Sequence, residues 1–249
     1  MALSDLAFAS GLSSLLIVLI GWLLGVYLIK RYLSSPDNNT LALAVILISV
    51  GSVWLAIAIN FVFALLNMSY LDKLTYILLI GWIPGVVGLA VGYVFMSIVK
   101  EEYLKPTMII FGIFFVINMV VNYVFIPIGY LGLDPESSIT FGPPSTTELP
   151  DATTNGVFKY LSALTIVIML ITAIFFILTA VRTDIALVRT RAGLLGVGFL
   201  IVSLLIPFDS VIGTDILFVL VAVRFAIVIG LFIMAMAITL PKRIFKNLA

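Results

Sequence analysis

The chain has 249 residues, of which 63% are hydrophobic and 10% are charged, and its formal net charge is +1. Soluble domains carry roughly 25% charged residues, so the composition excludes an ordinary soluble protein and favours a polytopic α-helical membrane protein. The apolar runs are continuous rather than alternating, which excludes a transmembrane β-barrel. The small net charge gives no indication of nucleic-acid binding.

The chain contains neither Cys nor His. This excludes disulfides, thiolate or imidazole metal ligands, haem held by either residue, and catalytic pairs built on them. No paired acid and base converge anywhere in the pattern. We therefore expect a protein that is not an enzyme and that needs no cofactor or metal.

Seven hydrophobic segments have about the length needed to cross a bilayer. We predict an all-α, seven-helix membrane bundle that forms a single domain over residues 1–249. The predicted helices cover residues 6–29, 40–66, 74–99, 106–130, 157–181, 192–207 and 214–240.

The basic residues predict the orientation. With the N-terminus outside, only Lys73 and Lys159 fall in outer loops, and the inner side holds ten of the 13 basic residues. This follows the positive-inside rule and predicts a multi-pass protein of the plasma membrane with its C-terminus inside. The inner residues are Lys30, Arg31, Lys100, Lys105, Arg182, Arg189, Arg191, Lys242, Arg243 and Lys246.

The loop 131–156 is the longest predicted connection and is rich in Pro, Gly, Ser and Thr. It has few large apolar residues and cannot bury a core of its own. Three interpretations remain open: a mobile lid over the outer face, a partner-binding loop, or a plain flexible connector.

Small residues indicate how the helices pack. One face of the third segment carries Gly81, Gly85, Gly88 and Gly92, and one face of the last segment carries Ala222, Ala226 and Gly230. Such faces allow close helix contact, either within the bundle or at a dimer interface. Arg224 lies on nearly the opposite side of the last segment from Ala222, which suggests a central helix with neighbours on two sides.

Arg224 is the only charged residue deep within a hydrophobic segment. A charge at that depth costs roughly 3 kcal/mol on the most lenient insertion scale, so it should face protein or water. Asn60, Asn118 and Asn122 are predicted at a similar outer depth, with Trp82 and Tyr123 nearby. They suggest an outward-facing polar pocket for a ligand with a carboxylate, a phosphate or another acceptor.

A structural role for Arg224 is the alternative to this pocket. Backbone carbonyls, the asparagines, or Asp209 in the predicted turn before the last segment could bind its guanidinium group. Asp215 is a poorer candidate, because a separation of nine residues places it half a turn out of phase with Arg224.

Missing residues exclude several membrane functions. No carboxylate is predicted at mid-membrane, so a proton relay or a pump-type cation site has no residues to use. The predicted topology is similar to that of microbial rhodopsins, but the last segment has no Lys to form a retinal Schiff base.

The chain resembles the seven-helix membrane sensor region at the N-terminus of some histidine kinases. The shared features are Trp54, the run Gly81-Trp82-Ile83-Pro84-Gly85, the run Arg189-Thr190-Arg191, Pro207, and the basic exit at Lys242-Arg243. The sequence stops at Ala249, without a coiled-coil linker or a kinase. The resemblance therefore implies a sensor-like module that signals through a separate partner.

Three function classes remain. The first is a receptor-like or regulatory module that binds a ligand or lipid in its outer half. The second is a structural or accessory subunit that contacts a membrane-protein partner or another copy of itself. The third is an anion-selective channel or transporter, which the lack of an internal repeat weakens. The inner basic residues would dock a partner, or they reflect only the positive-inside rule and contact with anionic lipid.

Overall fold

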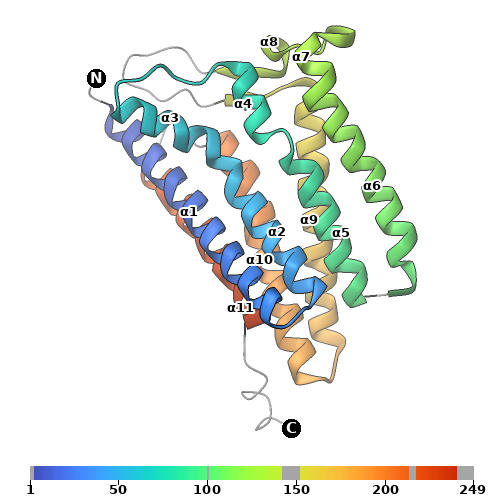
Figure 1. The fold of residues 1–249 in the computed structure, drawn as a ribbon. Coiled ribbons are helices and arrows are strands. Elements are labelled where there is room, and N and C mark those ends of the chain that lie inside the picture. Colours follow the sequence, from blue (N-terminus) through green and yellow to red (C-terminus); the bar gives the residue numbers. More distant parts are fainter. Residues whose placement is uncertain (1–2, 100, 142–151, 213–216, 240–249) are drawn as a thin grey trace.

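The computed structural model describes residues 3–99, 101–141, 152–212 and 217–239 (Figure 1). Seven helical spans in this part of the chain are long and apolar enough to cross a membrane, which confirms the predicted all-α membrane bundle. The spans are Asp5–Ser34, Asn38–Leu65, Lys73–Ile98, Leu104–Ile128, Gly156–Arg182, Ala186–Asp209 and Leu217–Thr239.

Four spans are continuous helices: α1 (Asp5–Ser34), α9 (Gly156–Arg182), α10 (Ala186–Ile212) and α11 (Leu217–Thr239). The other three are interrupted. The second span consists of α2 (Asn38–Gly51), the 3₁₀ turn η1 (Ser52–Trp54) and α3 (Leu55–Leu65), and the third of α4 (Lys73–Ile80) and α5 (Ile83–Val99). The fourth follows the 3₁₀ turn η2 (Glu101–Tyr103) and consists of α6 (Leu104–Val120), the π-helical turn η3 (Val121–Phe125) and α7 (Ile126–Ile128).

The loop before α9 contains regular structure at both of its described ends. It holds the 3₁₀ turn η4 (Tyr130–Gly132), the short helix α8 (Pro135–Ser138), and the antiparallel strands β1 (Ile139–Phe141) and β2 (Ala152–Thr154). A plain flexible connector therefore does not describe these ends. Residues 142–151 of the predicted loop lie outside the described part of the chain.

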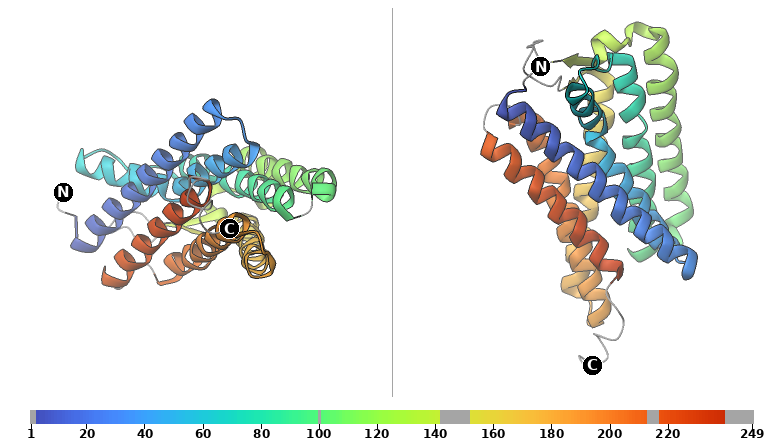
Figure 2. Two further views of the ribbon diagram at one scale, coloured as in Figure 1. Left: turned by 90° about the horizontal axis from the view of Figure 1, so that it is seen from below. Right: turned by 60° about the vertical axis from the view of Figure 1, so that its left-hand side comes forward.

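The helices form a ring with one helix outside it. α1 packs against α2 and α11, α10 lies between α11 and α9, and α5 contacts α2, α9 and α6. α6 stands at the edge of the bundle, as the views from the side and from below show (Figures 1 and 2). The expectation that the last helix is central is wrong: the second span is the most enclosed, because it lies between α1 and α5.

Glycines bring α1 and α2 into close contact. A Cβ atom added to Gly21 would lie 2.8 Å from both the Cα of Gly51 and the carbonyl oxygen of Leu47. A Cβ at Gly25 would lie 2.4 Å from the Ile48 side chain. The Gly21–Gly25 pair is thus used inside the bundle, as small residues commonly are between membrane helices.

The glycine face of the third span packs on the fourth span. Gly81 and Gly85 contact Asn122 and Asn118, while Gly88 and Gly92 contact two phenylalanines of α6, Phe114 and Phe111. In the last span, Gly230 is buried against α10, whereas Ala222 is exposed and Ala226 is partly exposed. Only one of those three small residues therefore lies in a tight contact between helices.

The sixth span differs most from its prediction. Pro207 was expected to end it, but α10 begins at Ala186 and continues through Pro207 to Ile212. A proline removes one backbone donor and bends a helix, yet membrane helices tolerate it where neighbouring groups bond the freed carbonyl. The extension places Asp209 on the helix rather than in a turn.

We expect Gly21→Ala to lower the free energy of unfolding by about 1–3 kcal/mol, because the new methyl group meets backbone atoms that cannot move aside. Thermal or denaturant unfolding of the purified protein in detergent measures the change. Gly112→Ala is the matched control, since no atom lies within 4 Å of a Cβ built there. Equal stability of the two variants would contradict the close contact between α1 and α2.

Candidate functional site

One helical hairpin lies between the interruption of the second span and the interruption of the third span. We call it the cap hairpin (residues 55–80, α3 to α4). η1 precedes it, and the turn at Gly81 and Trp82 follows it. Its connecting loop is tied to its own first helix, because the backbone N–H of Leu71 donates to Oδ1 of the buried Asn60 at 2.9 Å. Figure 1 shows α3 leaning away from the axis of α2. The cap hairpin is thus a separate unit within two spans.

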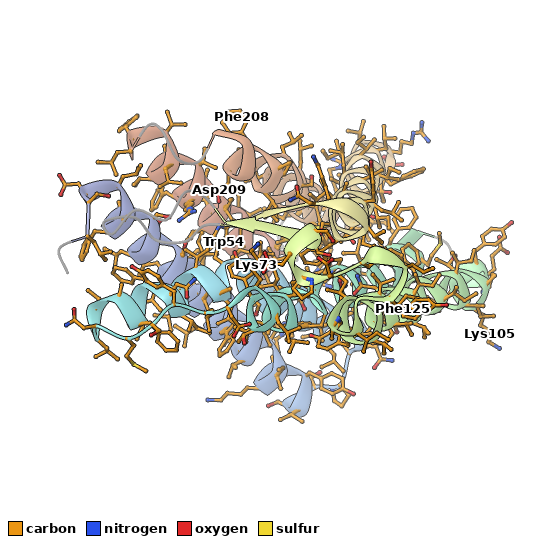
Figure 3. The ribbon with its side chains drawn as sticks, turned by 90° about the horizontal axis from the view of Figure 1, so that it is seen from above. Trp54, Lys73, Lys105, Phe125, Phe208 and Asp209 are labelled. Atoms are coloured by element: carbon orange, nitrogen blue, oxygen red, sulfur yellow. The ribbon has the colours of Figure 1, made fainter. Side chains whose placement is uncertain are left out.

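The first interruption follows from a Gly-Ser pair, a frequent cause of helix kinks. Side chains of two other helices hold it. The indole Nε1 of Trp22 in α1 donates to the Ser52 hydroxyl at 2.9 Å, and Nε1 of Trp54 donates to Oδ2 of Asp209 in α10 at 2.8 Å. Figure 3 shows Trp54 beside Asp209, while the neighbouring Phe208 points outward.

The carboxylate of Asp209 also binds Arg224. Nε of Arg224 lies 3.0 Å from Oδ1 and 3.3 Å from Oδ2, and only 1% and 8% of the two side chains are exposed. Nη1 of Arg224 donates to the carbonyl oxygen of Ser10 at 2.6 Å and to the hydroxyls of Ser10, Ser13 and Ser14 at 2.8–3.1 Å. We call this set the Arg224–Asp209 network. It joins α1, α10 and α11 to the start of the cap hairpin.

The second interruption follows from Pro84. A proline has no N–H to donate to the residue four positions earlier and clashes with its carbonyl group, and here that residue is Ile80, the last of α4. Backbone groups released inside a bilayer must find partners within the protein, since lipid offers none.

Side chains of two neighbouring spans bind the backbone around this interruption. Nδ2 of Asn122 donates to the carbonyl oxygen of Gly81 at 2.9 Å, and Oδ1 of Asn118 accepts from the N–H of Gly85 at 3.2 Å. The Thr165 hydroxyl in α9 donates to the carbonyl oxygen of Pro84 at 3.0 Å. Two aromatic side chains add bonds to the last turn of α4: Tyr123 Oη donates to Leu78 and Trp82 Nε1 to Leu79.

The π-helical turn of the fourth span presents some of these side chains. Asn122 and Tyr123 lie within Val121–Phe125, where the backbone widens before Pro127. π-Turns occur mostly as single insertions in helices and frequently at functional sites. In this span, the turn directs the Asn122 amide toward Gly81 and the Tyr123 hydroxyl toward Leu78.

These features occupy one layer of the bundle. α2, α5 and α6 run for 14, 17 and 17 residues from the opposite end before their interruptions. At 1.5 Å per residue, these lengths correspond to roughly 21–26 Å. Thr165 and Arg224 lie 17 and 15 residues from the ends of their own helices at Arg182 and Thr239. We call this level the polar layer.

The structure separates the six predicted ligand-binding residues into three groups. Arg224 binds Asp209 and the serines of α1, Asn60 binds the loop of the cap hairpin, and the remaining four surround the second interruption. Asn60, Asn118 and Asn122 are fully buried, and within the described residues each binds backbone groups rather than Arg224. The structural alternative, in which Asp209 and a carbonyl group bind Arg224, is present. Asp215 lies outside the described residues.

Sequence reasoning missed part of the site. The sequence predicts Asp209 in an outer turn if Pro207 ends its helix, whereas α10 continues through Pro207. Ser10, Ser13 and Ser14 were not considered, although their spacing of three and one places all three on one side of an otherwise apolar helix. Three hydroxyls on one side of a membrane helix are a pattern that could have indicated a buried polar partner.

The start of α4 in the cap hairpin has polar contacts of its own. Lys73 at the start of α4 forms an ion pair with Glu136 of α8. Asp72 caps α4: its carboxylate accepts from the N–H and the hydroxyl of Thr75, both at 2.8 Å. The two bonds hold the pKa of Asp72 below its ordinary value of 3.8.

A surface hollow of about 320 Å³ lies where the cap hairpin meets the first turns of α1. Its walls are Leu3, Asp5 and Phe8 from one side and Ala64, Leu65 and Asn67 from the other. This volume is at the lower end of the range for small-molecule pockets. The hollow offers one carboxylate and one amide between apolar walls.

Within the described residues, no group of three or more His, Cys, Asp and Glu side chains could hold a metal ion. Comparisons with models of known protein families, with curated proteins and with solved structures find no match to this chain.

We expect Arg224→Gln and Asp209→Asn each to lower the free energy of unfolding by about 3–5 kcal/mol, because each leaves an unpaired charge in a buried site. The double variant buries no charge, so its loss should be smaller than the sum of the two single losses. Unfolding in detergent measures all three, with Lys159→Gln as a control that removes an exposed charge. Additive losses would show that the two side chains do not interact.

Asp72→Ala should destabilise the protein by about 0.5–2 kcal/mol at neutral pH through loss of the N-cap. The lowered pKa of Asp72 means that its contribution is complete above 3.8 and is lost as the pH falls through the lower folded value. The stability difference between wild type and variant, measured against pH, should therefore shrink below pH 3.8. A difference that stays constant down to pH 2 would contradict this assignment.

Proposed function

We propose that this protein is a non-enzymatic, receptor-like or regulatory seven-helix module of the membrane, which signals to a separate partner by moving the cap hairpin. The observation that carries the proposal is the pair of interruptions that bound this hairpin. Each is held by side chains of other helices in addition to the helical bonds that remain. A hinge needs such positions, where small changes of backbone angle reorient a whole element.

The Arg224–Asp209 network supports this role over anion selection. An anion-selecting Arg must present its guanidinium group to a pathway, whereas Arg224 is 1% exposed and its charge is compensated by Asp209. A compensated, largely buried pair is better suited to specifying one arrangement of helices. Because Trp54 shares the Asp209 carboxylate, a movement of α3 would alter this network.

The hollow between α1 and α3 is the entry point that we propose for a ligand or a lipid. Its two walls belong to α1 and to the cap hairpin, so a bound molecule would make different contacts when α3 moves. Differential contact of this kind is the requirement for shifting an equilibrium between two states. The carboxylate of Asp5 favours a ligand with hydrogen-bond donors.

The charge distribution supports an orientation with this hollow outside. Within the described residues, the end opposite the N-terminus carries Lys30, Arg31, Lys105, Arg182, Arg189 and Arg191. Basic ends of membrane helices favour the inner side. The hollow, the cap hairpin and α8 would then face outward in the plasma membrane, and the basic end would meet an inner partner, as the resemblance to kinase sensor regions implies. Lys242, Arg243 and Lys246 lie outside the described residues.

A structural or accessory subunit is the second candidate, and α6 favours it. This helix stands at the edge of the bundle against α5 and exposes Ile109, Ile110 and Ile113. Native mass spectrometry after gentle extraction from the cell's own membrane distinguishes the two candidates. A lone chain with a bound small molecule or lipid would support the receptor-like module, whereas a defined protein partner in fixed ratio would favour the subunit.

Trp54→Phe tests the hinge, since it removes the indole donor to Asp209 and keeps an aromatic ring. Natural cysteines are absent, so spin labels can be placed at Met68 in the cap hairpin and at Tyr160 in α9, both exposed. We expect the variant to shift or broaden the distance distribution between these labels. Labels at Leu33 and Val181, near the opposite end, form the control pair and should report no change.

An unchanged Met68–Tyr160 distribution in Trp54→Phe, with the protein folded, would show that the Arg224–Asp209 network does not position the cap hairpin. A change in both label pairs would indicate general loosening instead of a hinge.

A further inference from the structure

A second hollow, of about 330 Å³, lies on the surface of α9 near its C-terminal end. We call it the α9 groove. Its walls are Phe175, Leu178, Thr179, Arg182 and Thr183. Spacings of three and four residues place these side chains on one face of the helix. The groove lies at the end of the bundle opposite the N-terminus, far from the cap hairpin.

The charged end of the groove is Arg182. This side chain is exposed and forms no hydrogen bond or ion pair with any residue that the structure describes. Its neighbour Arg189 differs, since its Nε and Nη2 donate to the carbonyl oxygen of Thr183 at 3.1 and 2.9 Å. Arg182 is therefore an exposed guanidinium at this end of the bundle whose donors remain available to another molecule.

The other end of the groove is an apolar wall. Phe175 and Leu178 are 44% and 39% exposed. Phe175 is fixed by an edge contact with Phe95 of α5, at a ring separation of 5.2 Å. Thr179 directs its hydroxyl to the carbonyl oxygen of Phe175 at 2.8 Å, so its methyl group is left to line the groove. The wall therefore offers apolar surface in a span that crosses the membrane.

We propose that the α9 groove binds an anionic phospholipid. The phosphate would lie at Arg182, whose planar donors match phosphate oxygens, and an acyl chain would lie along Leu178 and Phe175. The order of the residues fits this molecule, because a lipid has its charge at the membrane surface and its chains deeper in the bilayer. The proposal is independent of the movement of the cap hairpin.

A lipid fits the groove better than a soluble phosphate compound does. Phe175 and Leu178 give the groove an apolar wall within a membrane-spanning helix, and a small hydrophilic anion would leave this wall without a partner. Basic residues near a membrane surface are attracted to anionic lipids by about 1 kcal/mol each. Arg182 thus predicts a modest preference for anionic headgroups. The groove determines where on the protein such a lipid lies.

The test uses the purified full chain in detergent with phosphatidylglycerol and phosphatidylcholine that carry the same acyl chains. Native mass spectrometry measures how much of each lipid the protein retains. We expect the wild type to prefer phosphatidylglycerol. Arg182→Gln should lower this preference by about fivefold, the factor that one basic residue near a surface provides. Lys159→Gln removes an exposed charge from the other end of the same helix and should leave it unchanged.

Two further measurements separate this site from general charge effects. Arg182→Lys should restore most of the preference, and soluble glycerol phosphate at the same concentration should not displace the lipid. Equal retention of the two lipids by the wild type would overturn the proposal. An equal loss in Arg182→Gln and Lys159→Gln would overturn it too, as would displacement by glycerol phosphate, which would indicate a site for free phosphate.

Discussion

The bilayer supplies no hydrogen-bond partners, and this constraint shapes the whole polar layer of the bundle. A regular helix satisfies its own backbone, but each interruption releases groups that only the protein can bond. Asn118, Asn122 and Thr165 fulfil this need around Pro84, each through one buried bond to the third span. The asparagines that suggested a ligand pocket in the sequence therefore complete the backbone of a neighbouring helix. Glycines at positions 81 and 85 permit these contacts, because a Cβ on either would lie within 3 Å of the asparagines.

The ion pair between Arg224 and Asp209 follows from the same lack of partners in the bilayer, here for charged groups. Neither Arg224 nor Asp209 could be buried alone at moderate cost, but together with four acceptors from α1 and one indole donor they form a compensated group. Such a group holds helices that are distant in the sequence at one relative position. It also removes the one deep positive charge from any pathway for anions. The geometry therefore favours a role in specifying and reporting helix positions over a role in transport.

Features that depend on composition and on the length of the apolar segments could be predicted from the sequence. Seven spans follow from hydropathy alone, and the break near Pro84 follows from the chemistry of proline. Features that depend on contacts between helices could not be predicted from the sequence. Pro207 has the same chemistry as Pro84, yet α10 continues past it, since tertiary contacts decide whether a membrane helix ends at a proline. Asp209 moved from a predicted turn into the core for this reason. The enclosed position of the second span likewise depends on packing against α1 and α5, which no single segment encodes.

The interruptions lie in one layer and divide the bundle into two halves with different helical regularity. On the side of the cap hairpin, three of the seven spans contain irregular turns, and side chains hold their backbone. Toward the basic end, α2 and α5 are regular helices of 14 and 17 residues, and they pack against each other. A displacement of the cap hairpin would reach the basic end through these two rods, because both are joined to it directly at η1 and at Gly81. Packed helices have few alternative arrangements, so a small displacement at the layer would favour a discrete shift over a gradual one. A receptor-like module needs this combination: a deformable half that contacts the ligand and a rigid half that carries the change to the other side of the membrane.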